Sequence, residues 1–150
     1  MTLNDIAWSF SSKIYTSKEE FSKAITDYQI AIFQTDEKWK PNEMAFYFPE
    51  LQIQYEAWIT GSEQLLNNET LLDEEDAFDE DNSDEGMFQV EIAAHLHADN
   101  GENFTALEFL FKTHNQLANK DLGDNVFFEG TDESPQIVDG LPLCYIICGS

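Results

Sequence analysis

The stretch LQIQYEAWI, Leu51 to Ile59, alternates between apolar and polar positions along its length. A period of two is typical of a β-strand with one face on a hydrophobic core and the other on solvent. The apolar side consists of Leu51, Ile53, Tyr55, Ala57 and Ile59. Trp58 falls on the polar side, where it is either an exposed binding anchor or a residue covered by a second layer.

The stretch MFQVEIAAHLH, Met87 to His97, repeats this pattern. Its polar side includes His95 and His97, two residues apart on one face. Its core side consists of Phe88, Val90, Ile92, Ala94 and Leu96. Two strands of this kind predict a sheet with one buried side and one side that faces solvent.

Two helices are expected beside this sheet. Ser17 and Glu20 form the S-x-x-E pattern of a capping box, and apolar residues follow at helical spacing. The pattern predicts a helix from about Lys18 to near Ala31, although residues 29–33 also fit a short strand. A second helix is expected over about Phe104 to Asn119, after a turn rich in N-cap residues.

Shorter apolar runs complete the expected sheet. Residues 44–48 and the Leu51–Ile59 strand look like a hairpin that turns around Pro49 and Glu50. Other strands are expected at 6–10, 126–128 and 141–148. The order of elements predicts an α+β fold in a single domain over residues 1–150, with a mostly antiparallel sheet and two helices on one face. Residues 62–86 are expected to form a flexible acidic insertion, with a helical turn around 63–66.

The charge of the chain is strongly negative. Thirty acidic residues face seven lysines and no arginine, which gives a formal net charge of −23. Between Asp73 and Glu85, nine of thirteen residues are acidic. Direct binding of nucleic acid or of an anionic membrane is therefore not expected, because such sites depend on arginine and on basic patches. A field of this sign favours encounter with a basic protein.

The termini and the cysteines indicate a cytoplasmic protein. The N-terminal residues lack the basic region of a signal peptide, and no apolar run approaches the length of a membrane span. Cys144 and Cys148 would lie about 13 Å apart on one strand, too far for a disulfide, and are expected to be reduced.

His95, His97 and Asp99 form an H-x-H-x-D pattern that resembles part of the metal-binding signature of metallo-β-lactamase-fold hydrolases. Asn100 stands where that signature has its last histidine. We therefore expect no stoichiometric metal and no cofactor, with exposed histidines as the simpler interpretation. A small metal-dependent hydrolase that uses His95, His97 and Asp99 remains the alternative enzyme hypothesis.

The chain resembles, at the level of a class, the small acidic immunity proteins of bacterial polymorphic and contact-dependent toxin systems. The resemblance is carried by its size, its charge of −23, the run Asp73 to Glu85 and the absence of arginine. It implies a non-enzymatic inhibitor without catalytic residues that binds and blocks a basic toxin domain, such as a nuclease. A regulator that mimics DNA and binds a DNA-binding protein is the alternative. The expected contact residues are Asp73, Glu74, Glu75, Asp76, Asp79, Glu80, Asp81, Asp84, Glu85 and Trp58.

Overall fold

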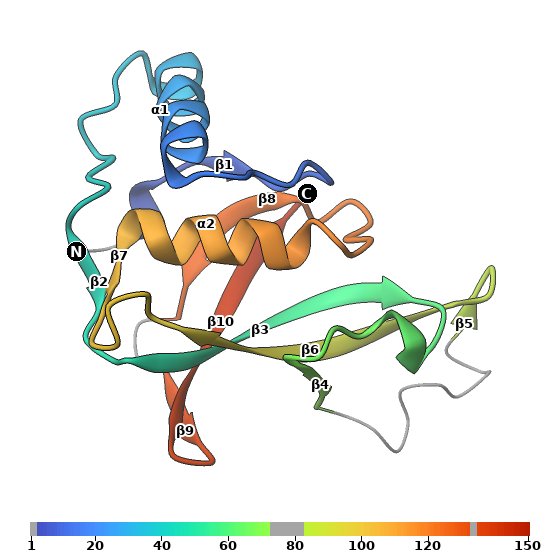
Figure 1. Ribbon diagram of the computed structural model, residues 1–150. Coiled ribbons are helices and arrows are strands. Elements are labelled where there is room, and N and C mark those ends of the chain that lie inside the picture. Colours follow the sequence, from blue (N-terminus) through green and yellow to red (C-terminus); the bar gives the residue numbers. More distant parts are fainter. Residues whose placement is uncertain (1–2, 73–82, 133–134) are drawn as a thin grey trace.

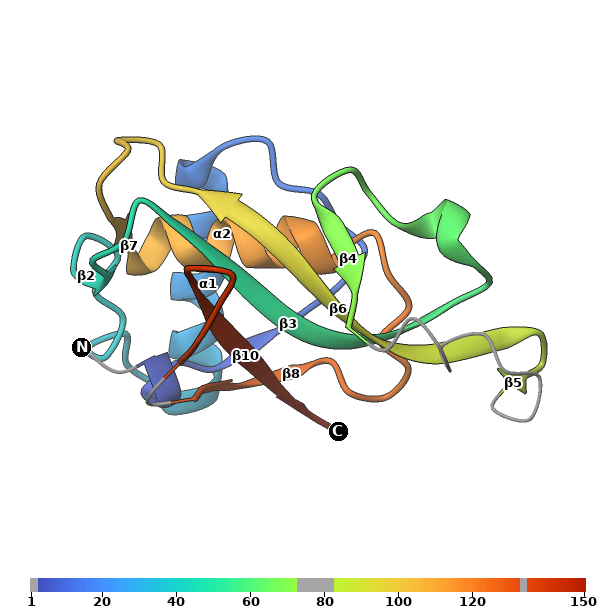
Figure 2. The ribbon, with the colours of Figure 1, turned by 90° about the horizontal axis from the view of Figure 1, so that it is seen from below.

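The computed structural model describes residues 3–72, 83–132 and 135–150. Within these ranges the chain forms an α+β fold with two α-helices and ten strands. Both helices lie on one face of a mostly antiparallel sheet, as the sequence predicted (Figures 1 and 2). One cluster of buried apolar side chains fills the space between the sheet and the helices.

The main sheet has the strand order β1-β8-β10-β3-β6-β4, with β5 paired to β6 and β9 paired to β10. All neighbouring strands are antiparallel except β3 and β10, which run parallel at its centre. The strands span Trp8–Ser9 (β1), Glu50–Ile59 (β3), Glu69–Leu71 (β4), Ser83–Asp84 (β5), Met87–His97 (β6), Phe127–Thr131 (β8), Gln136–Val138 (β9) and Leu141–Gly149 (β10).

The ladder between β3 and β6 confirms the two alternating patterns. Ten residue pairs connect these strands, from Glu50 with His97 to Ile59 with Phe88. All five predicted core residues of β3 are at most 1% exposed. Because the period of two is unbroken, the polar residues of both strands lie together on the opposite face.

Helix α1 begins where its cap predicted, whereas the second helix begins at Ala106, two residues later than expected, with Thr105 as its cap. Helix α1 spans Lys18–Phe33, and the Ser17 side chain accepts a hydrogen bond from the Glu20 backbone N–H. Residues 29–33 are therefore helical, and the alternative strand is wrong. Helix α2 spans Ala106–Leu117 and lies between α1 and the strands β3 and β6 (Figure 1). Phe109 on α2 is fully buried.

The predicted hairpin around Pro49 and Glu50 does not form. Strand β2 (Met44–Phe46) pairs with β7 (Phe104–Thr105) in a separate two-stranded sheet. Phe46 packs against Phe109, with 4.7 Å between the ring centroids. The aromatic run therefore covers the start of α2, a burial partner that local sequence could not reveal.

The expected insertion at 62–86 is only partly a loop. It contains a 3₁₀ turn at Ser62–Gln64, then β4, and finally β5. Residues 73–82 lie outside the described part of the chain, so the expected flexibility of that segment stays a prediction. Strand β4 forms because Glu69 and Leu71 face inward, on the same side as Ile92 of β6.

Glu69 holds β4 against the end of α2 through a buried polar network. Its carboxylate lies 2.9 Å from Lys120 Nζ, and both side chains are almost fully buried. Tyr55 and Gln116 also donate hydrogen bonds to it. Burial alone would raise the pKa of Glu69, but these bonds, with the Leu66 backbone N–H, hold the pKa below its usual value.

His114 joins α2 to the N-terminal segment inside an aromatic cluster. Trp8 Nε1 donates a hydrogen bond to His114 Nδ1 at 3.0 Å. Indole N–H groups only donate, so the ring proton must lie on Nε2, which contacts the Lys13 carbonyl at 2.8 Å. Burial lowers the pKa of this histidine. His114 is therefore a neutral structural residue.

Cys144 and Cys148 are free thiols that pack on the core. Burial raises their pKa values to about 12 and about 11. Because the thiolate is the reactive form, neither is suited to nucleophilic catalysis. No helix in the described ranges is sufficiently long and apolar to span a membrane.

Candidate functional site

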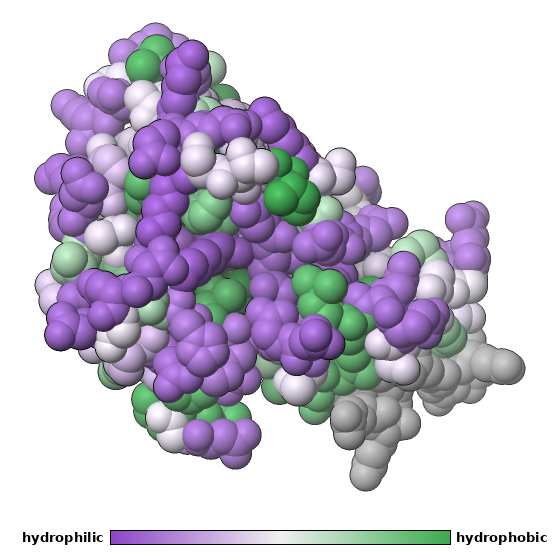
Figure 3. Space-filling model, in the orientation of Figure 1, coloured by the Kyte–Doolittle hydropathy of each residue, from purple (hydrophilic) through white to green (hydrophobic). Residues whose placement is uncertain are grey.

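Within residues 3–72, 83–132 and 135–150, no helix covers the face of the sheet opposite α1 and α2, which is turned toward the viewer in Figure 2. Outward-facing residues of β3, β6 and β10 form its centre, and we call this surface the acidic sheet face. It consists of Glu50, Gln52, Gln54, Glu56, Trp58, Gln89, Glu91, His95, His97 and Tyr145. Seen from the side in Figure 3, the molecule is mostly hydrophilic, and the hydrophobic residues that reach this side lie mainly in its lower half.

No lysine lies in any of the described strands. Five of the seven lysines belong to residues 13–40, which include α1. Lys112 lies on α2 and forms ion pairs with Asp99 and Glu108. Lys120 is buried against Glu69. Every lysine therefore lies outside the described strands, and the acidic sheet face has no lysine of its own to compensate its negative charge.

Glu56 and Glu91 form the centre of this surface. They are directly opposite each other on β3 and β6. Desolvation, the hydrogen bond to Glu91 and the repulsion between the two carboxylates raise the pKa of Glu56. Gln54 and Gln89 donate hydrogen bonds to Glu91 and Glu56 respectively. Like charges placed directly opposite are destabilising, so this pair is maintained at a cost to the fold.

Tyr145 of β10 lies beside the same two carboxylates. Burial raises its pKa, and the negative charges of Glu91 and Glu56 raise it further. Tyr145 is half-buried and pairs with Gln54 in the parallel ladder between β10 and β3. An aromatic ring next to paired carboxylates is a combination that recognises the guanidinium group of arginine.

Trp58 lies on this face as the sequence indicated, and it is half-buried. Its backbone N–H donates to the Asp121 carbonyl at 2.8 Å. Gly123 follows with a positive φ of 63°, and a Cβ there would lie 3.2 Å from Trp58 Nε1. The turn at 121–123 therefore covers one side of the indole, and the role of Trp58 as a binding anchor stays a prediction.

Most of the predicted contact acids lie outside the described residues: Asp73, Glu74, Glu75, Asp76, Asp79, Glu80 and Asp81. Asp84 and Glu85 are described and exposed, at the end of β5. The strands on either side of the run, β4 and β5, both pair with β6, through Leu71 with Ile92 and Ser83 with Phe88. Ile92 and Phe88 are four residues apart, so Leu71 and Ser83 pair with β6 at points about 13 Å apart along it. The described residues on either side of positions 73–82 therefore both lie at the edge of β6.

The H-x-H-x-D pattern does not assemble as a unit. His95 and His97 lie on the acidic sheet face, whereas Asp99 lies 2.6 Å from Lys18 and 2.8 Å from Lys112. Hydrogen bonds from these two lysines lower the pKa of Asp99. The third side chain beside the histidines is Glu50. Sequence reasoning placed Glu50 in a turn, and no local signal connects it to His95 and His97, which are 45 and 47 positions away.

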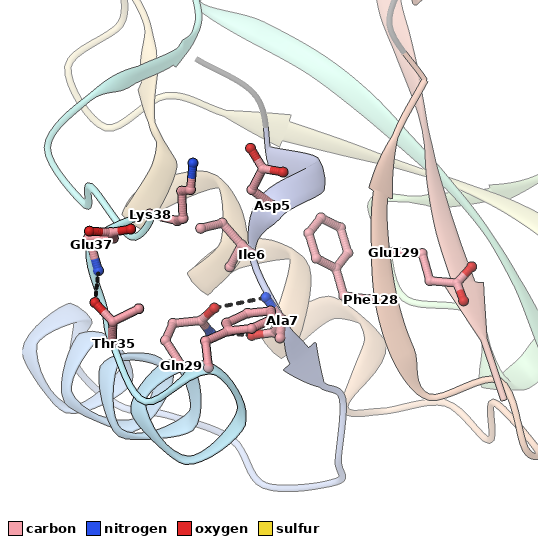
Figure 4. A pocket seen from close by; sticks show the side chains of 10 residues that line it. Asp5, Ile6, Ala7, Gln29, Thr35, Glu37, Lys38, Phe128 and Glu129 are labelled. Atoms are coloured by element: carbon pink, nitrogen blue, oxygen red, sulfur yellow. Dashed lines mark hydrogen bonds between the residues drawn. The ribbon is translucent and has the colours of Figure 1, made fainter.

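A separate cavity of about 560 Å³ lies between the N-terminal segment, the end of α1 and β8 (Figure 4). Its size is within the range of small-molecule sites. Gln29 lies in its wall, but its side chain accepts from the Ala7 N–H and donates to the Ala7 and Ile25 carbonyls. The protein therefore already satisfies the Gln29 amide, and this side chain has no free donor or acceptor directed at a ligand.

No protein family matches this chain, and no curated protein or solved structure matches it significantly.

Proposed function

We propose that this protein is a non-catalytic inhibitor that binds a basic protein domain through the acidic sheet face. The observation that supports the proposal is the Glu56–Glu91 pair, two opposed carboxylates in the middle of a surface whose strands carry no lysine. A lysine or arginine from a partner would relieve their repulsion. Binding would then recover free energy that the isolated protein gives up to keep the pair together.

The residues around the pair suit this role. Trp58 and Tyr145 are aromatic, half-buried and on the same face, and such residues commonly dominate the energy of protein interfaces. Gln54 and Gln89 hold the two carboxylates in place. A rigid β-sheet positions all of these groups before binding, which lowers the entropic cost of association.

The partner class that best fits this surface is a toxin domain that cuts nucleic acid. The active site of a nuclease must attract phosphates, so it is positively charged. Carboxylates presented on a sheet would bind the same basic groups and block access of the substrate. The protein would then act as an immunity protein in the cytoplasm of the cell that makes the toxin. A regulator that mimics DNA would use the same surface on a different partner, a DNA-binding protein.

Affinity capture with the full chain tests this proposal. The bait is compared with the double variant Glu56→Gln/Glu91→Gln and with a control variant Glu19→Gln/Asp27→Asn, which removes two exposed acids from α1. We expect wild type and the control to capture a basic protein that the sheet variant loses. The purified protein should then inhibit the enzymatic activity of that partner at a one-to-one ratio.

Three results separate the possibilities. Equal capture by both variants would contradict the assignment of the surface. Capture of a partner that is not basic would contradict the proposed class. A captured DNA-binding protein without toxic activity would favour the DNA-mimic alternative.

A further inference from the structure

Glu50, His95 and His97 meet at one end of the acidic sheet face, where β3 begins and β6 ends. Glu50 is directly opposite His97, and His95 shares the face because it is two residues away on the same strand. Glu50 Oε1 lies 3.0 Å from His95 Nε2 and 3.1 Å from His97 Nδ1. Among the residues that the structure describes, this is the one group of three such side chains whose ligand atoms all lie within 4.8 Å.

The three groups approach closely without bonding one another well. His95 Nε2 is shielded from solvent and makes no hydrogen bond, although Glu50 Oε1 is only 3.0 Å away. The oxygen must therefore lie away from the direction in which the ring nitrogen donates or accepts. The two imidazoles are stacked, with 4.5 Å between centroids and 24° between planes. The two ring nitrogens and the carboxylate oxygen nevertheless lie within 4.8 Å of one another, a spacing that allows them to share one ion.

We propose that Glu50, His95 and His97 bind one divalent transition-metal ion, with Zn²⁺ the best match. Imidazole nitrogen and carboxylate oxygen are common zinc ligands at about 2.0–2.2 Å, and tetrahedral ligands at that distance lie about 3.3 Å from each other. The contacts of 3.0 and 3.1 Å are close to this spacing. Ca²⁺ and Mg²⁺ prefer oxygen ligands only, so two imidazoles disfavour them.

The ligand set has an open fourth position. The side chains of Glu50, His95 and His97 are 40%, 36% and 68% exposed, so solvent reaches the site. Three protein ligands and one exchangeable position are the arrangement of zinc ions that bind an additional group. This ligand set differs from the H-x-H-x-D pattern, because Asp99 is engaged by Lys18 and Lys112. The expectation of no metal site depended on that pattern and did not include Glu50.

Zinc titration of the full chain, after treatment with a chelator, tests the proposal. Isothermal calorimetry with ZnCl₂ should give one saturable site per chain. Loss of a second-shell group alone typically weakens metal binding by ten- to a hundredfold, so His97→Asn and Glu50→Gln should each weaken it by about a hundredfold or more. The variant Glu56→Gln is the matched control, because it removes an acid from the same strand and face but outside the cluster. It should leave the affinity unchanged.

Salt distinguishes direct coordination from diffuse attraction to a chain of charge −23. At about 1 M ionic strength the screening length falls to about 3 Å, which removes diffuse binding but leaves coordination. The proposal is supported if wild type and Glu56→Gln each bind one zinc ion at high salt and His97→Asn does not. His97 is largely exposed, so this variant should fold normally, and its circular dichroism spectrum checks that it does. Absence of a saturable site, or equal loss of binding in Glu56→Gln, would overturn it.

Discussion

Glu56 on β3 and Glu91 on β6 are direct partners in the register, and Gln89 and Gln54 donate hydrogen bonds to their respective carboxylates. Burial and this neighbour raise the pKa of Glu56, so the folded protein holds its proton more tightly than the unfolded chain does. The contribution of Glu56 to stability is therefore present at low pH and is lost as the pH rises through its folded-state pKa. Like charges placed directly opposite each other are destabilising, so the ionised pair opposes folding.

We expect the variant Glu56→Gln to be more stable than wild type at neutral pH, by about 0.5 kcal/mol. The difference should shrink near pH 4.3, the ordinary pKa of a glutamate, where protonation removes the repulsion in wild type. Urea unfolding of wild type and Glu56→Gln, at neutral pH and near pH 4.3, measures this difference in the free energy of unfolding. Asp27→Asn on α1 is the control for the general effect of removing one negative charge. A gain no larger than in that control would show that the pair carries no special repulsion.

His114 should make stability depend on pH below neutrality. Its environment consists of Trp8, Phe10, Tyr15 and Phe21, together with the Lys13 carbonyl. Burial lowers its pKa, so the unfolded state binds a proton first as the pH falls below about 6.5. The contribution of neutral His114 to the free energy of unfolding is complete above about pH 6.5. It declines as the pH falls toward the pKa of His114 in the folded state.

The variant His114→Gln tests this dependence, because glutamine cannot titrate but keeps a donor and an acceptor. We expect it to be less stable than wild type at pH 7, by about 1–3 kcal/mol. The gap should narrow as the pH falls from about 7 to about 5. Urea unfolding across that range provides the measurement, with His97→Asn as the control. A constant gap would mean that His114 does not titrate differently in the two states.

The Glu69–Lys120 pair should show strong coupling. Removing the cation with Lys120→Met leaves a buried carboxylate with only neutral donors, which we expect to cost about 3–5 kcal/mol. The double variant Glu69→Gln/Lys120→Met should lose much less than the sum of the two single losses, because no charge remains buried. Chemical unfolding of all three proteins gives the interaction energy. Additive losses would show that the two side chains act independently.

The acidic run and the acidic sheet face should affect different rates of partner binding. Replacing Asp79, Glu80, Asp81, Asp84 and Glu85 by amides should mainly slow association, because exposed charges steer the encounter. Replacing Glu56 and Glu91 should mainly accelerate dissociation if they lie under the partner, where pairs are desolvated. Association and dissociation rates of the captured partner, measured over a salt series, separate the two effects. If the association rate changes neither with salt concentration nor with the five replacements, the acidic run serves only to keep the protein soluble.

The local elements of this fold could be predicted because their causes are local. The alternation in Leu51–Ile59 and Met87–His97 places every second side chain on one face, whatever the rest of the chain does. The Ser17 cap bonds to an N–H only three residues away, so its sequence pattern is complete in itself. The failed hairpin at Pro49 shows the limit. Adjacent apolar runs predict pairing only if no other partner competes, and Phe104–Thr105 competed successfully for β2.

The sequence by itself determined the class of the fold, the two long strands, the start of the first helix and the negative charge of the chain. Only the tertiary structure decided which acids stand together. Glu56 meets Glu91, Glu50 meets His95 and His97, and Glu69 meets Lys120 across 35 to 51 positions of chain. These contacts depend on strand register and on the packing of β4 against α2, which result from the burial of the whole core. A local sequence pattern cannot predict these contacts, because the residues next to each partner do not indicate which distant residue it will meet.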